Sequence, residues 1–237
     1  MKKDKLYFKR GTKVVGAYTC QDNLYITSVR IPEGARSINA CAFNRCMFLC
    51  DLSLPAGSLK TIGRMAFTCT SLTEIALPDS VEFIDELAFA FNSDLRSVHI
   101  GRGVKLIMPG AFSGCARLEK ITIDSRNDNY YVHNGCLIEK KSEKLVAIAS
   151  PYVVADGVKI IENQTFISLV YCDSITIPDS VEHIGMEGDA PNNFSMCMSI
   201  EYEGDVEWRS RPFVIKASRG SYAERFAKDN NFIFEEI

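Results

Sequence analysis

The sequence lacks the features that mark membrane-spanning, exported and disulfide-stapled proteins. No apolar run approaches the roughly 18 residues that a membrane helix needs. Leu6-Tyr7-Phe8 is followed at once by Lys9 and Arg10, so no secretion signal is recognisable, and we expect either no export or a signal that has been removed. The nine cysteines are odd in number and include no Cys-x-x-Cys, which disfavours a disulfide framework.

Motifs of catalysis and cofactor binding are also missing. None of the three histidines pairs with a nucleophile in a recognisable local motif, and His-Glu-x-x-His, the P-loop and Gly-x-Ser-x-Gly do not occur. Gly101-Arg102-Gly103 begins like a dinucleotide loop but continues without the third glycine. We therefore expect no enzyme, no cofactor and no metal. The least favoured alternative is an enzyme with its site on the irregular segment 185–197.

The charge is distributed unevenly. The net charge is 27 − 30 = −3, yet residues 1–16 hold six Lys and Arg against one acid, which leaves 21 − 29 = −8 for the remainder. An acidic body argues against nucleic acid as a partner. The basic N-terminus is read as a solvated terminus in preference to an arm that touches anionic surfaces.

Three apolar columns appear when the chain is written in blocks of 23 residues. They are Ile26, Leu49, Leu72, Leu95 and Leu118; Val29, Leu52, Ile75, Val98 and Ile121; and Ile31, Leu54, Leu77, Ile100 and Ile123. At 46% apolar composition, chance fills all of these positions in about one case in 100,000. The resulting pattern, Leu-x-x-Leu-x-Leu, predicts a short strand with two inward side chains and one outward. Proline lacks an N–H and is predicted to end the strands at Pro32, Pro55 and Pro78.

A second apolar set returns in the other half of each block. An isoleucine precedes a phenylalanine by five residues in the pairs Ile38 and Phe43, Ile62 and Phe67, Ile84 and Phe89, Ile107 and Phe112, and Ile161 and Phe166. The Ala or Thr before each phenylalanine is predicted to allow a tight turn while the ring fills the interior. Stacking such coils at about 4.8 Å joins both apolar faces into one core, so the sequence predicts a repeat solenoid, mostly β, with irregular or short 3-10 turns.

The repeats resume after an interruption at residues 124–150. Pro178-Asp179-Ser180-Val181-Glu182 repeats the segment at 78–82, and strand positions of two later coils are predicted at Ile175, Ile177, Ile200 and Tyr202. The interruption contains Asn134-Gly135, a dipeptide typical of hairpin turns, and its apolar segments 136–138 and 145–148 flank a charged loop at 139–144. We predict an inserted β-hairpin that projects from the stack or extends it.

Both ends are predicted to be capped, because an open end exposes a core layer. Ser221 and Glu224 form a capping-box pattern, and one helix face carries Tyr222, Ala223, Phe226 and Ala227. Phe232 and Phe234 then alternate in a closing strand. The chain is predicted to be a single domain, 1–237, with an N-terminal cap (1–20), regular repeats (21–123), the hairpin (124–150), partly irregular repeats (151–210) and a C-terminal cap with a helix (211–237).

Two segments carry a specific resemblance. Residues 177–185 (IPDSVEHIG) match the first half of a repeat unit, and residues 111–118 (AFSGCARL) match its second half. This unit resembles the BspA-like branch of the leucine-rich repeats. The inserted segment 124–149 and the terminal segment 220–224 are similar to elements of the same family, and the resemblance covers residues 13–237. It implies a right-handed leucine-rich-repeat coil of about 23 residues per turn. It also implies adhesion to proteins, often at a cell surface, although this chain shows no signal.

The outward strand positions form a small, polar row without aromatic anchors: Arg30, Ser53, Ala76, His99, Thr122, Thr176 and Glu201. The hairpin offers Tyr130, Tyr131 and His133, whose tyrosines serve either as binding anchors or as packing against the solenoid. The candidate protein-contact residues are therefore Arg30, His99, Thr122, Thr176, Tyr130, Tyr131 and His133.

Cys46, Cys69 and Cys115 are predicted to share one column, because 23 and 46 residues separate them. They form either a thiol ladder for soft metal or oxidation or, as the favoured interpretation, a buried position for a small side chain. For the whole chain we expect a non-catalytic, adhesion-type protein-binding module with a protein ligand, such as a host or matrix protein. The alternative is a structural spacer with no ligand of its own.

Overall fold

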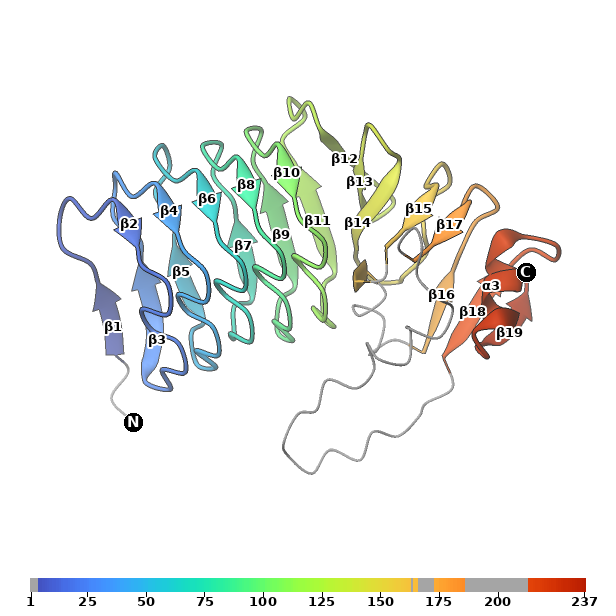
Figure 1. Ribbon diagram of the computed structural model, residues 1–237, viewed down its shortest axis with the longest axis horizontal. Coiled ribbons are helices and arrows are strands. Elements are labelled where there is room, and N and C mark those ends of the chain that lie inside the picture. Colours follow the sequence, from blue (N-terminus) through green and yellow to red (C-terminus); the bar gives the residue numbers. More distant parts are fainter. Residues whose placement is uncertain (1–3, 163, 166–172, 186–212) are drawn as a thin grey trace.

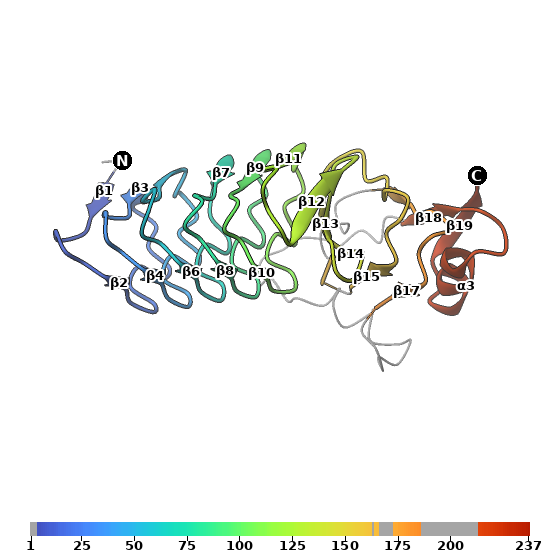
Figure 2. The same ribbon diagram turned by 90° about the horizontal axis from the view of Figure 1, so that it is seen from above.

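The computed structural model describes residues 4–162, 164–165, 173–185 and 213–237. It is a β-solenoid of about 9 turns with a period of about 23 residues and a helix at its C-terminal end (Figure 1). Seen from above, the longer strands line one side of the stack and the two-residue strands line the other (Figure 2). The predicted solenoid is thus confirmed.

The longer strands are parallel and keep the 23-residue register of the sequence. They are β1 (Asp4–Tyr7), β3 (Ile26–Arg30), β5 (Asp51–Ser53), β7 (Glu74–Ala76), β9 (Ser97–Ile100) and β11 (Lys120–Ile123). Val29 pairs with Leu52, and Val98 pairs with both Ile75 and Ile121, which is the second apolar column. The strands form two three-stranded sheets, β1-β3-β5 and β7-β9-β11.

The short strands form a five-stranded parallel sheet on the other side. They are β2 (Val14–Val15), β4 (Ser37–Ile38), β6 (Thr61–Ile62), β8 (Phe83–Ile84) and β10 (Leu106–Ile107). The second residue of each strand is buried and the first is at least partly exposed. The predicted N-terminal cap is therefore a coil of its own, since β1 and β2 add one strand to each sheet.

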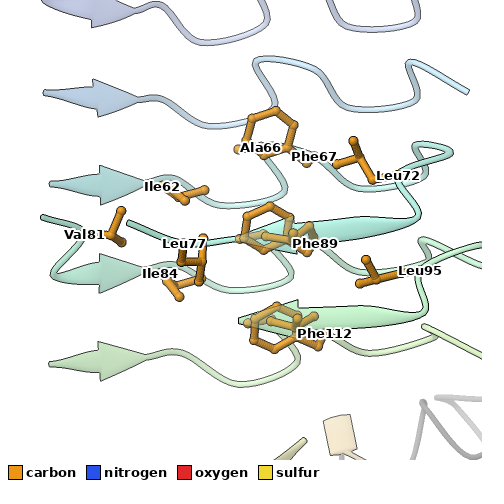
Figure 3. Packing of buried hydrophobic residues seen from close by; sticks show 14 of the residues in the cluster. Ile62, Ala66, Phe67, Leu72, Leu77, Val81, Ile84, Phe89, Leu95 and Phe112 are labelled. Atoms are coloured by element: carbon orange, nitrogen blue, oxygen red, sulfur yellow. The ribbon is translucent and has the colours of Figure 1, made fainter. Parts of the chain in front are cut away.

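A ladder of phenylalanine rings fills the arc that follows the short strands (Figure 3). Phe43, Phe67, Phe89 and Phe112 stack with centroid distances of 5.2, 5.4 and 5.7 Å, and the edge of Phe8 closes the N-terminal end at 6.3 Å. The tight bends were predicted at the alanines, but the structure places them elsewhere. They lie two residues before and after each phenylalanine, where φ is positive: Cys41, Arg45, Met65, Cys69, Leu87, Phe91, Gly110 and Gly114.

The prediction of one cysteine column is wrong for Cys69. Cys46 and Cys115 stand three residues after their phenylalanines and are buried, whereas Cys69 stands two residues after Phe67, at a positive-φ position, and is partly exposed. The phenylalanines are spaced by 24, 22 and 23 residues, so equal spacing along the chain does not give equal positions in the coils. The thiol of Cys46 donates to the Cys20 carbonyl at 3.0 Å, and that of Cys115 donates to the Phe89 carbonyl at 3.4 Å.

The insertion has three strands and extends the stack. The strands β12 (Tyr130–His133), β13 (Cys136–Glu139) and β14 (Lys144–Ile148) are antiparallel, with the predicted turn at Asn134-Gly135. β14 then pairs in parallel with β15 (Ile160–Ile161), and β15 pairs with β17 (His183–Ile184). Leu137 belongs to the core cluster of the N-terminal coils, while its neighbour Ile138 belongs to a second, C-terminal cluster. β13 therefore separates the two core clusters.

Side chains of the insertion complete hydrogen bonds at the end of the regular stack. β10 is the last short strand of its sheet, and the N–H of Ile107 donates to the hydroxyl of Tyr130 at 2.9 Å. The buried amide of Asn127 donates to the carbonyls of Gly101 and Val104, each at 3.1 Å. The insertion thus supplies hydrogen-bond partners to backbone groups of the last regular coil.

The C-terminal strands form a last parallel sheet with the order β16 (Ser174–Thr176), β18 (Val214–Ala217) and β19 (Ile233–Glu236). The strand beside β16 is thus β18, whereas the predicted positions Ile200 and Tyr202 lie outside the described residues, as does Phe166. Ile175 and Ile177 are buried as predicted.

The helix α3 (Tyr222–Asp229) covers this end and buries Ala223, Phe226 and Ala227, as expected. The hydroxyl of Ser221 accepts from the N–H of Glu224 at 3.1 Å. The carboxylate of Glu224 accepts from the N–H of Gly220 at 2.5 Å, one residue before the predicted capping-box partner.

Candidate binding surface

The outward positions of the longer strands bring together only two of the predicted contact residues. His99 and Thr122 are partners in the register of β9 and β11, and the His99 Nδ1 lies 3.0 Å from the Thr122 hydroxyl oxygen. Arg30 lies on β3, in the other sheet, and Thr176 lies on β16, beyond the insertion. The predicted row is therefore an extended surface rather than one compact site.

The three predicted contact residues of the insertion differ in their exposure. Tyr130 is 2% exposed, and its burial raises the pKa of the phenol to about 12. This side chain packs and is unavailable to a partner. Tyr131 is half-buried against the C-terminal core, and partial burial raises the pKa of its phenol too. His133 is exposed beside the turn.

Aromatic side chains that the sequence reasoning missed are exposed on the first two coils. Tyr7 is 67% and Tyr25 68% exposed, and Phe48 is 49% and Met47 40% exposed. Tyr7 pairs in register with Arg30, so a tyrosine and an arginine stand side by side on the outward face. We call Tyr7, Tyr25, Arg30, Met47 and Phe48 the aromatic edge.

The aromatic edge could have been found from the repeat alignment. Tyr25 and Phe48 directly precede Ile26 and Leu49 of the first apolar column. The same position holds polar residues in the next three coils, namely Ser71, Asp94 and Arg117. The ion pair of 2.7 Å between Asp94 and Arg117 confirms that this position stacks from coil to coil. A change from polar to aromatic residues within one column is the signal.

Neither a metal-binding cluster nor a membrane-spanning helix occurs in the described part of the chain. It holds no cluster of three or more His, Cys, Asp or Glu side chains with the geometry to share a metal ion. None of its helices has the length and apolar composition to cross a bilayer. Burial raises the pKa of the Cys46 thiol to about 11 and that of Cys115 to about 12. The irregular segment 185–197 lies, apart from Gly185, outside the described residues.

The two strand faces, the phenylalanine arc and the repeat period define a solenoid of leucine-rich repeats. Residues 13–139 and 147–202 match the family model of the BspA type leucine-rich repeat region, in six copies. The chain belongs to this family, as its sequence motifs indicated.

Solved structures support the same fold. A leucine-rich repeat protein from Eubacterium ventriosum is 22% identical with a TM-score of 0.53, and the match covers 74% of this chain and 62% of that one. The pneumococcal vaccine antigen PcpA is 20% identical with a TM-score of 0.50, over 68% of this chain and 47% of that one. The chain thus spans less than two thirds of either structure. No curated protein matches the chain.

Proposed function

We propose that the chain is a protein-binding module that contacts its partner through the outward face of the longer strands, with the aromatic edge as its anchor. Two observations carry the proposal: the exposed Tyr7 stands beside Arg30, and the exposed Tyr25 and Phe48 stand just before β3 and β5 on consecutive coils. Tyrosine and arginine are enriched among the residues that dominate protein interfaces, together with aromatic and methionine side chains in the wider contact area.

The solenoid supports this role by its rigidity. Strand pairing on both faces and the stacked phenylalanines fix the backbone that carries the outward side chains, so little backbone conformational entropy is lost on binding. His99, Thr122 and Thr176 continue the surface along the stack, and Tyr131 and His133 lie beyond β11. A partner of extended shape would reach from the aromatic edge to these residues.

We further propose that the partner is a protein of a cell surface or matrix, as the family resemblance implies. The test is to immobilise the chain, present solubilised surface and matrix proteins, and measure the affinity of each retained protein with the purified components. Tyr25→Ala combined with Phe48→Ala should weaken that affinity by about tenfold or more, as loss of anchors does.

The matched control is Leu106→Ala on the short-strand face, where an apolar side chain of similar exposure, 43%, is removed. The control should bind like the wild type. If the Tyr25 and Phe48 double variant also binds like the wild type, the aromatic edge is not the anchor. Failure to retain a protein from any fraction would favour the alternative, a structural spacer.

A further inference from the structure

Positively charged side chains lie on consecutive coils at the N-terminal end of the solenoid, next to the short strands. Lys13, Arg36 and Lys60 each directly precede a short strand. The N–H of Arg36 donates to the carbonyl of Lys13 at 2.7 Å, and the N–H of Lys60 donates to that of Arg36 at 2.8 Å. These three exposed cations, which we call the basic row, therefore stand on adjacent rungs.

The side chain of Lys13 also points toward the next coil. Its Nζ lies 3.1 Å from the point where a Cβ on Gly34 would stand, so the charge is placed near the turn that leads to Arg36. Lys9 and Arg10, both exposed, add two further cations in the preceding turn. Within the described residues, no acidic side chain forms an ion pair with Lys13 or Arg36.

The continuation of this row shows the opposite arrangement. Glu82 occupies the next rung and bonds to Lys60 and to Lys105, each at 2.7 Å. The hydrogen bonds and charges of these two lysines, Lys105 first, lower the pKa of Glu82 to about 2. Beyond the insertion, the same position alternates again, with Lys159 bonded to Glu182 at 2.8 Å. Opposite charges on neighbouring rungs are thus the pattern along the rest of the row.

The basic row departs from a pattern that stabilises the stack. Like charges on neighbouring strands repel one another, whereas opposite charges attract. An acid at position 36 would make the first rungs alternate as Lys60, Glu82 and Lys105 do. A local arrangement that costs stability and has no structural compensation is typical of a functional site. The charge that would compensate this row is that of an anionic ligand.

We propose that the basic row binds an extended acidic segment of a protein, an inference that rests on the proposed protein-binding function and specifies the chemistry of the partner. The row is one side chain wide, and rungs about 4.8 Å apart place its three cations along roughly 10 Å. Carboxylates on alternate residues of an extended chain lie about 6.7 Å apart on one side, within reach of flexible Lys and Arg side chains.

The neighbouring outward residues favour a peptide over other polyanions. Val14, Ser37 and Thr61 flank the basic row on the same three rungs. Two of them offer hydroxyl groups, and none offers the aromatic face on which the bases of a single-stranded nucleic acid stack. The single line of charge also suits a linear ligand better than a flat anionic membrane.

The probe is a fluorescein-labelled octapeptide of alternating Glu and Ser, and binding is measured by fluorescence anisotropy at low and at high salt. The wild-type chain should bind the peptide, and added salt should weaken the binding because it screens exposed charges. Lys13→Gln combined with Arg36→Gln should weaken it about tenfold, since both freely available charges are lost. The charge-matched control is Arg96→Gln combined with Lys159→Gln, which removes two cations that pair with acids elsewhere and should leave binding unchanged.

A second variant separates a binding role from a structural one. Arg36→Glu should abolish peptide binding and at the same time raise the melting temperature, because Lys13 and Lys60 then face an opposite charge. A lower melting temperature of Arg36→Glu overturns the repulsion argument. Equal peptide binding by the Lys13 and Arg36 variant and the wild type overturns the proposal, as does tighter binding of heparin or oligothymidylate than of the peptide.

Failure of this proposal is distinguishable from failure of the proposed function. Tyr25→Ala with Phe48→Ala leaves the basic row intact and should bind the acidic peptide like the wild type. Retained peptide binding with no retained surface or matrix protein would count against the proposed partner and not against the basic row. A retained partner with no peptide binding would count against the basic row alone.

Discussion

Replacing Phe89 by alanine tests the register of the whole solenoid. The ring is fully buried and lies between Phe67 at 5.4 Å and Phe112 at 5.7 Å. Truncation of a buried phenylalanine to alanine costs about 3–5 kcal/mol, because transfer free energy is lost and a cavity remains. For a domain of this size, each kcal/mol lowers the melting temperature by roughly 2–4 °C, so we expect a drop of about 6–20 °C.

The assay is thermal unfolding followed by circular dichroism, with urea unfolding as a second measurement. Phe89→Leu should lose less stability, since leucine fills much of the cavity. Phe48→Ala removes the same side chain from an exposed position and should change the free energy of unfolding by less than about 0.5 kcal/mol. If Phe89→Ala melts within about 2 °C of the wild type, the phenylalanine ladder is not the core of the arc.

Four further predictions concern a hydrogen bond, the thiols and the helix cap. Tyr130→Phe leaves the N–H of Ile107 without its acceptor and should cost about 1–3 kcal/mol in urea unfolding; an unchanged midpoint would contradict the bond. Iodoacetamide at pH 8 should modify exposed Cys50 and spare Cys115 in the native chain, as read by peptide mass spectrometry. The pKa of the Cys115 thiol is about 12 when folded and lower when unfolded, so its contribution to stability is complete below pH 9 and should be lost progressively above it. Ser221→Ala should destabilise the chain by about 1 kcal/mol in the same urea assay, and Ser221→Asp should restore most of the loss.

The apolar columns could be predicted from the sequence because repetition multiplies a weak signal. One Leu-x-x-Leu-x-Leu segment fits many structures, but five segments at one spacing leave few alternatives. The pairing of Val29 with Leu52, and of Val98 with Ile75 and Ile121, follows. The cysteine column failed because one coil is a residue longer before Ile62 and a residue shorter after Phe67. The longer strands keep the 23-residue spacing while the arc shifts by one.

The candidate site was less predictable, because exposure depends on what packs against each residue. The Asn134-Gly135 turn and the apolar segments 136–138 and 145–148 were visible in the sequence, but the strand at 130–133 and the pairing of β14 to β15 were not. Tyr130 and Tyr131 are adjacent and chemically identical. Only the position of β12 at the end of the regular stack makes Tyr130 a buried acceptor for the N–H of Ile107.

The sequence by itself determined the repeat unit, its period, the inward residues of each coil and the capping helix. These features are local or periodic, and each depends on patterns within about 23 residues. The tertiary structure alone decided which side chains on neighbouring coils meet. It placed Tyr7 beside Arg30 and set Lys13, Arg36 and Lys60 on adjacent coils. It also placed β13 between the two core clusters. Contacts of this kind depend on the small variations in coil length that set the register of one coil on the next.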